Sequence, residues 1–94
     1  MQFYTNDDEI VEAQKLNNLE DALKIHEWVT GRPNLPIDRS LIGIKFLDYG
    51  YISIYLGDNN YLKVNKSDYL VKDNRENFKT YTCDEFKKEF RRVQ

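Results

Sequence analysis

The spacing of apolar positions changes along the chain and predicts both helices and strands. Over residues 19–29, apolar side chains recur every three or four positions, with Asn18 and Gly31 where an N-cap and a terminating glycine belong. This pattern predicts an amphipathic helix. An imperfect alternation over residues 9–16 predicts a strand before it. The proline-containing segment 32–36 cannot continue the helix and is expected to form an extended loop.

From Leu41 onward, apolar and polar residues alternate with a period of two, which is typical of half-buried strands. Polar clusters containing Gly, Asp and Asn separate the alternating runs and predict tight turns. The predicted strands are residues 41–47, 51–56, 61–65, 69–72 and 78–81.

The last segment predicts a short helix that begins at a capping box. The Thr82 hydroxyl and the Glu85 carboxylate are spaced to accept hydrogen bonds from each other's backbone N–H groups. Phe86, Phe90 and Val93 continue one apolar stripe, and Lys87, Lys88, Arg91 and Arg92 cover the rest. We therefore predict a single α+β domain over residues 1–94. It combines an antiparallel β-meander of four to five strands with one helix in the N-terminal half and a short C-terminal helix.

Composition excludes several classes of site. The 94 residues contain one cysteine and one histidine, so neither a disulfide within the chain nor a zinc or iron–sulfur centre is expected. We predict no cofactor and no metal. No apolar run is long enough to span a bilayer, and the acidic start of the chain lacks the features of a signal peptide. A cytosolic protein without a membrane partner is expected.

The two residues with catalytic potential fit structural roles better. His26 belongs to the apolar stripe of the first predicted helix, and no serine or cysteine motif accompanies it. Cys83 lies in the first turn of the last helix, in phase with Phe86. We therefore predict no enzymatic activity.

The tyrosines are the most informative candidates for a binding surface. Tyr51, Tyr55 and Tyr61 have the opposite parity to the aliphatic residues of their strands, which places them on one face of the predicted sheet near Lys45 and Lys63. Three interpretations stay open for this face. Helices cover it as a second core, a protein partner binds it, or nucleic-acid bases stack on it.

Several short segments resemble a family of small, uncharacterised bacteriophage and prophage proteins. Residues 10–14, Ile-Val-Glu-Ala-Gln, resemble the opening strand V-I-E-A-x-Q of that family. Residues 67–73 resemble its G-D-Y-I-I-K-G segment, with Ser67 and Asp73 in place of glycines. Residues 78–83 followed by Phe86 resemble its closing F-Y-P-C…F segment, without the proline. The resemblance implies a phage or prophage origin, action in the cytoplasm of a bacterial host cell and no established catalytic activity.

These observations favour a non-catalytic accessory protein that acts by binding a host or phage protein, and whether this binding inhibits that protein stays open. The alternative is a protein that binds nucleic acid or nucleotides through the tyrosine-bearing sheet face. The net charge of −2 argues against general polyanion binding, although residues 39–94 alone carry a formal charge of +3. Formation of a homo-oligomer through an exposed aromatic face stays open.

Overall fold

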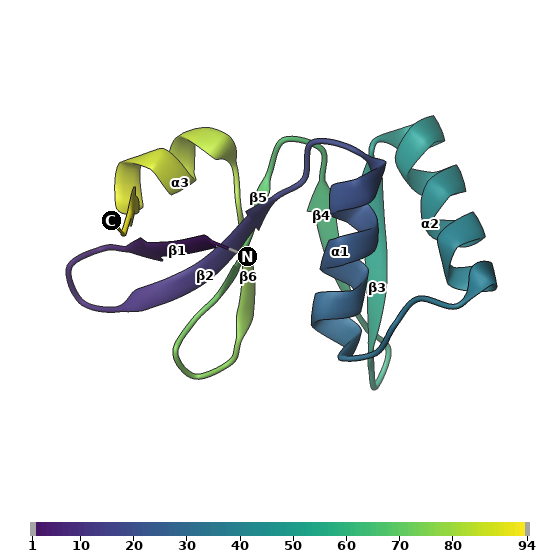
Figure 1. The fold of residues 1–94 in the computed structure, drawn as a ribbon, viewed down its shortest axis with the longest axis horizontal. Coiled ribbons are helices and arrows are strands. Elements are labelled where there is room, and N and C mark those ends of the chain that lie inside the picture. The colour runs from purple at the N-terminus through teal and green to yellow at the C-terminus, as the bar shows by residue number, and fades with distance from the viewer. Residues whose placement is uncertain (1, 94) are drawn as a thin grey trace. The chain divides into compact units, whose positions relative to one another are not determined.

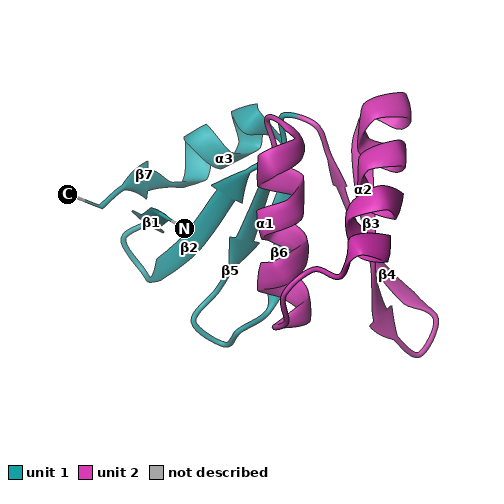
Figure 2. Ribbon diagram, turned by 45° about the vertical axis from the view of Figure 1, so that its right-hand side comes forward, with its two compact units in different colours: residues 1–15, 67–94 teal, residues 16–66 magenta. Residues whose placement is uncertain are grey.

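The computed structural model describes residues 2–93 and confirms the predicted α+β class. These residues form three helices and seven strands, and every strand pairing among them is antiparallel. The strands belong to two separate sheets (Figure 1). The chain divides into two compact units, residues 1–15 with 67–94 and residues 16–66 (Figure 2). The prediction of a single domain over residues 1–94 stays a prediction.

Unit 1, residues 1–15 with 67–94, is built on a five-stranded sheet with the order β6-β5-β2-β1-β7. Each pairing is antiparallel, and the central contact joins β2 to β5 with Lys15 opposite Tyr69. The five strands are β1 (Gln2–Thr5), β2 (Ile10–Lys15), β5 (Tyr69–Lys72), β6 (Phe78–Tyr81) and β7 (Arg91–Arg92).

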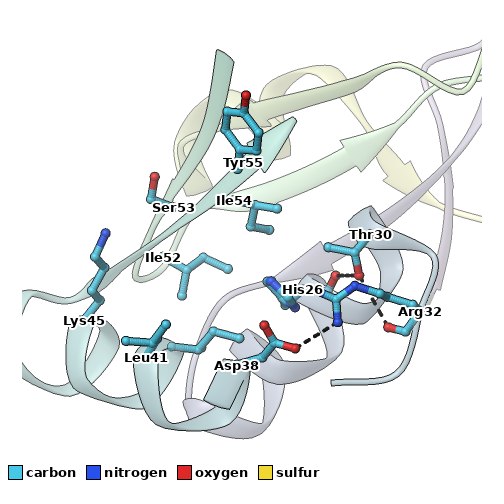
Figure 3. Close-up of a pocket in the computed structure, with 11 residues that line it drawn as sticks. His26, Thr30, Arg32, Asp38, Leu41, Lys45, Ile52, Ser53, Ile54 and Tyr55 are labelled. Atoms are coloured by element: carbon cyan, nitrogen blue, oxygen red, sulfur yellow. Dashed lines mark hydrogen bonds and ion pairs between the residues drawn. The ribbon is translucent and has the colours of Figure 1, made fainter. Parts of the chain in front are cut away.

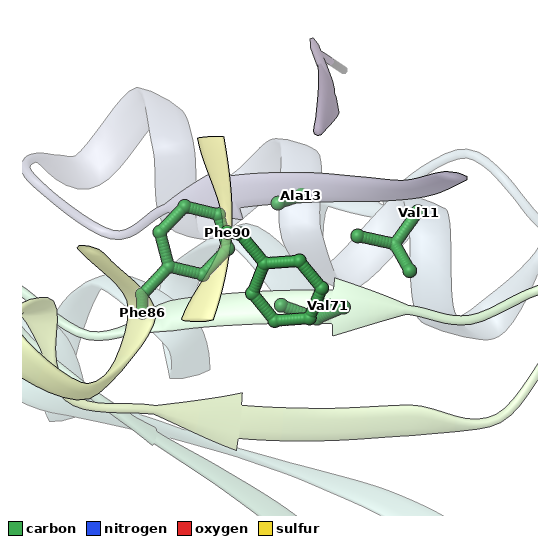
Figure 4. Packing of buried hydrophobic residues seen from close by; sticks show 5 residues of the cluster. All are labelled: Val11, Ala13, Val71, Phe86 and Phe90. Carbon is green, nitrogen blue, oxygen red and sulfur yellow. The ribbon is translucent and has the colours of Figure 1, made fainter. Parts of the chain in front are cut away.

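Helix α3 (Cys83–Glu89) closes the core of unit 1. Phe86 and Phe90 are buried with three small sheet residues, Val11, Ala13 and Val71 (Figure 4). At the N-terminus of the helix, the Thr82 hydroxyl accepts from the Glu85 N–H at 3.2 Å, and the Glu85 carboxylate accepts from the Thr82 N–H at 2.9 Å. The predicted order of strand, turn, strand and capped helix in the C-terminal part of the chain is therefore confirmed.

The last helix does not continue to Val93, as the predicted apolar stripe requires, so this part of the prediction is wrong. The helix ends at Glu89, and Phe90 already has an extended backbone, with φ −121° and ψ 149°. Arg91 and Arg92 then pair with β1 as a short strand instead of continuing the helix. The Arg91 guanidinium also forms an ion pair with Asp7. Pairing with a distant strand thus ends the helix before Val93, which is 39% exposed.

Unit 2, residues 16–66, contains two helices and a two-stranded hairpin. The Asn18 side chain accepts from the Asp21 N–H at 2.9 Å, and Gly31 ends the first helix in the left-handed conformation, with φ 72°. Both predicted helix signals are therefore confirmed. The elements of this unit are α1 (Leu19–Thr30), α2 (Pro36–Tyr49), β3 (Tyr51–Gly57) and β4 (Asn60–Asn65).

The strand predicted over residues 41–47 is wrong, because this segment belongs to α2. Pro36 occupies the first helical position, where a missing N–H costs nothing. The Asp38 carboxylate accepts from the Leu35 N–H at 2.8 Å and satisfies a free donor of the first turn. Ile42 and Phe46 are buried and are spaced four residues apart, so the same apolar residues fit a helix and a strand.

The β3–β4 hairpin ends in a tight turn and presents two different faces. Asp58 and Asn59 have φ values of 52° and 62°, the combination that a type I′ turn requires. On one face Ile52, Ile54 and Val64 are buried, and both helices of unit 2 contact β3. The predicted meander is thus divided, with its first hairpin in unit 2 and its later strands in unit 1. Among the described residues, no helix is long and apolar enough to cross a membrane.

Candidate binding surface of unit 2

The structure brings the three predicted tyrosines and Lys63 onto one face of the β3–β4 hairpin. Tyr55 lies directly opposite Tyr61, and their ring centroids are 5.1 Å apart. Both rings are more than half exposed, at 56% and 65%. Tyr51 is half-buried, and the Lys63 ammonium lies 4.4 Å from the centre of its ring. We call these four residues the tyrosine face.

Lys45 does not lie on this face, contrary to the sequence-based expectation. Its segment is helical, so Lys45 extends from α2. It lines a groove on unit 2 together with Ser53 and Tyr55 of β3 (Figure 3). The error follows directly from the incorrect strand assignment of residues 41–47.

This groove has a volume of about 470 Å³ and is lined by residues of α1, α2, the loop between them and β3. Its lining includes Ile52, Ser53, Ile54 and Tyr55, four consecutive residues of the strand. Successive side chains of a strand point to opposite faces, so a groove that touches all four must follow the strand edge. The other lining residues are His26, Thr30, Arg32, Asp38, Leu41, Ile42 and Lys45.

The hydrogen-bond register identifies the backbone groups at this edge. The Lys66 N–H donates to the Gly50 carbonyl at 2.8 Å, which makes these residues a hydrogen-bonded pair next to the pair Tyr51–Asn65. Hydrogen-bonded and non-hydrogen-bonded pairs alternate in an antiparallel ladder. The N–H and C=O groups of Tyr51, Ser53 and Tyr55 therefore point away from β4. In residues 2–93, β3 pairs with β4 alone.

The charged side chains that line the groove differ in whether they have an ion-pair partner. Arg32 donates to the Asp38 carboxylate at 2.9 Å. This hydrogen bond, helped by the Leu35 N–H, holds the pKa of Asp38 below its usual value. Lys45 is exposed and forms no ion pair with any described residue. Among the described lysine and arginine side chains that line the groove, Lys45 is therefore the one available to a ligand.

His26 is half-buried beside the groove and is oriented by Asn34. The Asn34 Nδ2 group donates to the Leu23 carbonyl at 3.0 Å, so its Oδ1 atom must face His26. His26 Nδ1 lies 2.6 Å from that oxygen and must carry the proton in this hydrogen bond. The ring thus joins α1 to the following loop. Cys83, the other candidate, lies half-buried at the start of α3 in unit 1.

The outward side of α2 carries an apolar stripe that the sequence analysis missed. Its members are spaced three or four positions apart, which makes them neighbours on a helix surface. Their exposed fractions lie between 57% and 70%. The α2 stripe consists of Ile37, Leu41, Ile44 and Leu47. The helical spacing was visible in the sequence, together with Pro36 as a helix-start signal, but the alternation of neighbouring residues favoured a strand.

Comparison with known proteins gives no further guide to this surface. No family model, no curated protein and no solved structure matches the chain. The function is therefore inferred from the chemistry and geometry of the described side chains.

Proposed function

We propose that the chain is a non-catalytic, phage-type accessory protein that acts by binding a partner protein through the α2 stripe. The observation that carries this proposal is the row of four large aliphatic side chains on the solvent side of one helix. The resemblance of residues 67–73 and 78–83 to small phage proteins supports the phage-type origin.

The α2 stripe is unusual because α2 already has a buried side. Ile42 and Phe46 are the buried residues of the helix, whereas Ile44 and Leu47 are more than half exposed. Contiguous exposed apolar residues on a protein surface mark interaction sites more often than isolated ones do. Complete burial of an Ile or Leu side chain stabilises by about 1.5–3 kcal/mol. The four side chains of the stripe are already partly covered, so complete burial of all four against a partner would stabilise the complex by roughly 4–8 kcal/mol.

The stripe favours a protein partner with an apolar groove or helix face. Unit 2 contains six acidic and six basic residues, so its formal charge is zero. A nucleic acid requires several cations against its phosphates, and a neutral unit with an aliphatic stripe does not supply them. An apolar protein surface is the chemical match.

Site-specific photo-crosslinking in a bacterial host tests this proposal. A benzophenone amino acid replaces Ile44 in the stripe or, as the matched control on the same helix, Arg39. We expect one host or phage protein to crosslink at position 44 and not at position 39. Equal labelling at both positions, or labelling at neither, contradicts the proposal. A crosslink between two copies of this chain contradicts it as well, since it makes the stripe a dimer contact.

Affinity measurements with the purified partner then test the contact directly. Ile44→Glu should weaken binding at least thirtyfold, because it puts a charge into an apolar contact. Arg39→Glu should leave the affinity within about threefold. The affinity should barely change as salt rises, whereas phosphate contacts weaken steeply. Binding of labelled single-stranded DNA that is lost on Tyr55→Ala and Tyr61→Ala would instead support the nucleic-acid alternative.

A further inference from the structure

We propose that the free edge of β3 binds an extended peptide segment of the partner as an added β-strand. The inference rests on the proposed function, because it specifies which part of a partner protein unit 2 would hold. The groove along this edge adjoins the α2 stripe, since Leu41 belongs to both. One partner would thus contact the stripe and the edge together.

The backbone of β3 offers the hydrogen bonds that such a strand needs. The outward N–H and C=O groups belong to Tyr51, Ser53 and Tyr55, at every second residue, and form no hydrogen bond within residues 2–93. A row of alternating donors and acceptors with this spacing is matched by another extended chain. Among ligand classes, an extended peptide is therefore the best fit.

The sequence of the edge also lacks two of the features that protect exposed strands from pairing. Natural edge strands usually carry a charge or a proline, or are covered by another element. Residues 51–55, Tyr-Ile-Ser-Ile-Tyr, contain neither a charge nor a proline. The irregularity in the ladder lies beyond Tyr55, at the tip of the hairpin. In its central part, the edge therefore has no charge, proline or ladder irregularity that would prevent pairing.

The groove beside the edge indicates which side chains the peptide carries. Ile42, Ile52 and Ile54 provide an apolar floor, as the close-up shows for the two β3 residues (Figure 3). An added strand directs every second side chain to this floor, where a large aliphatic residue fits. Lys45 at the rim has no carboxylate partner among the described residues. The ligand is therefore an extended segment with one large aliphatic residue and a nearby Asp or Glu.

A displayed library of random eight-residue peptides, selected on the complete chain, tests the inference. We expect the selected peptides to share alternating β-branched or aliphatic residues and one acidic residue. Their affinities are then measured by fluorescence anisotropy on the wild type, Ser53→Pro and Ser53→Thr. The proline removes an outward N–H but no ladder bond to β4, so it should weaken binding at least tenfold. Threonine keeps the N–H and should stay within threefold.

Amide hydrogen exchange on the wild type gives an answer that does not depend on whether Ser53→Pro folds. A bound peptide should slow exchange of the outward amides of Tyr51, Ser53 and Tyr55 at least tenfold. The amides of Ile52 and Ile54 point to β4 and should change little. Lys45→Gln should weaken the binding of acidic peptides threefold to tenfold. It should leave unchanged the binding of the same peptides with Asn or Gln in place of Asp or Glu.

Three results would overturn the inference: no enriched peptide, equal binding by Ser53→Pro when folded, or unchanged exchange of the outward amides. Its failure can be separated from that of the proposed function with Ile44→Glu. Ile44 does not line the groove, so selected peptides should bind this variant as they bind the wild type. Peptide binding without a partner crosslink at position 44 supports the edge site alone. If Ile44→Glu abolishes binding of the partner but Ser53→Pro leaves it unchanged, the result supports the α2 stripe alone.

Discussion

Replacing Phe86 with alanine should be among the most destabilising changes in the described chain. Phe86 is 2% exposed, and its ring stacks on Tyr69 with centroids 3.9 Å apart and planes 9° apart. It also contacts Tyr4 edge-on at 4.8 Å and stacks on Phe90 at 5.1 Å. One side chain thus joins α3 to the sheet of unit 1 and to the residue that ends the helix.

The expected loss follows from burial and ring geometry. Truncation of a buried Phe to Ala typically costs about 3–5 kcal/mol, and a well-oriented aromatic pair adds about 0.5–1.5 kcal/mol beyond its buried area. We expect Phe86→Ala to lower the free energy of unfolding by about 4–5 kcal/mol. A chain of this length has a total stability of roughly 5–14 kcal/mol, so the loss is about a third of the total at the upper end of this range and nearly all of it at the lower end.

Urea unfolding followed by far-ultraviolet circular dichroism measures this loss, with linear extrapolation to water. Phe86→Leu keeps most of the volume and should cost less, about 1–2 kcal/mol, so it remains measurable if the alanine variant does not fold. Phe3→Ala is the matched control, because Phe3 is 53% exposed. We expect it to cost about 1 kcal/mol or less. Similar losses for Phe86→Ala and Phe3→Ala would refute the assigned role of the Phe86 ring.

The same titration tests the predicted single domain. Trp28, the only tryptophan, lies on α1 in unit 2, whereas Phe86 lies in unit 1. If residues 1–94 unfold as one domain, Phe86→Leu should shift the Trp28 fluorescence transition by as much as the circular dichroism transition. A fluorescence transition that stays at its wild-type midpoint would show that the two units unfold separately.

Three further changes test local features. Ser67 has φ 77°, which is costly for a residue with a side chain, so Ser67→Gly should raise the free energy of unfolding by roughly 0.5 kcal/mol in urea titrations, whereas Ser67→Ala should not. The Thr82 N–H and hydroxyl hold the pKa of Glu85 below its usual value. The capping stabilisation should therefore be complete above the usual carboxyl range and disappear as pH falls through the lowered value, and unfolding curves of Glu85→Gln should lack this part of the acid dependence. Nitrogen-15 NMR at alkaline pH should show the proton of neutral His26 on Nδ1, and Asn34→Ala should shift it towards Nε2; an unchanged tautomer would contradict the proposed hydrogen bond.

Local signals predicted the elements that have their own caps. The helix from Leu19 was predictable from Asn18 and Gly31, and the final helix start from Thr82 and Glu85. These signals are short-range, so no knowledge of distant contacts is needed. The end of the final helix was not predictable, because it depends on pairing of Arg91 and Arg92 with a strand 86 or more residues earlier.

Helix α2 and the binding surfaces show a different limit of prediction from the sequence. Ile42, Ile44 and Phe46 alternate like strand residues, but only Ile42 and Phe46 are buried, as a helix requires. Strand parity correctly grouped Tyr55 with Tyr61, because that pattern depends only on the pleat. The free edge of β3 could not be predicted, since it depends on which strands enter which sheet.

The insertion of unit 2 into unit 1 has a consequence for synthesis on the ribosome. Strand β2 ends at Lys15, but its neighbour β5 begins at Tyr69, on the far side of residues 16–66. A nascent chain therefore carries β2 without this neighbour until all of unit 2 has been translated. At elongation rates of about 5–20 residues per second, that interval lasts several seconds. During this interval, β1 is the only sheet neighbour of β2 among the described strands that has already been synthesised.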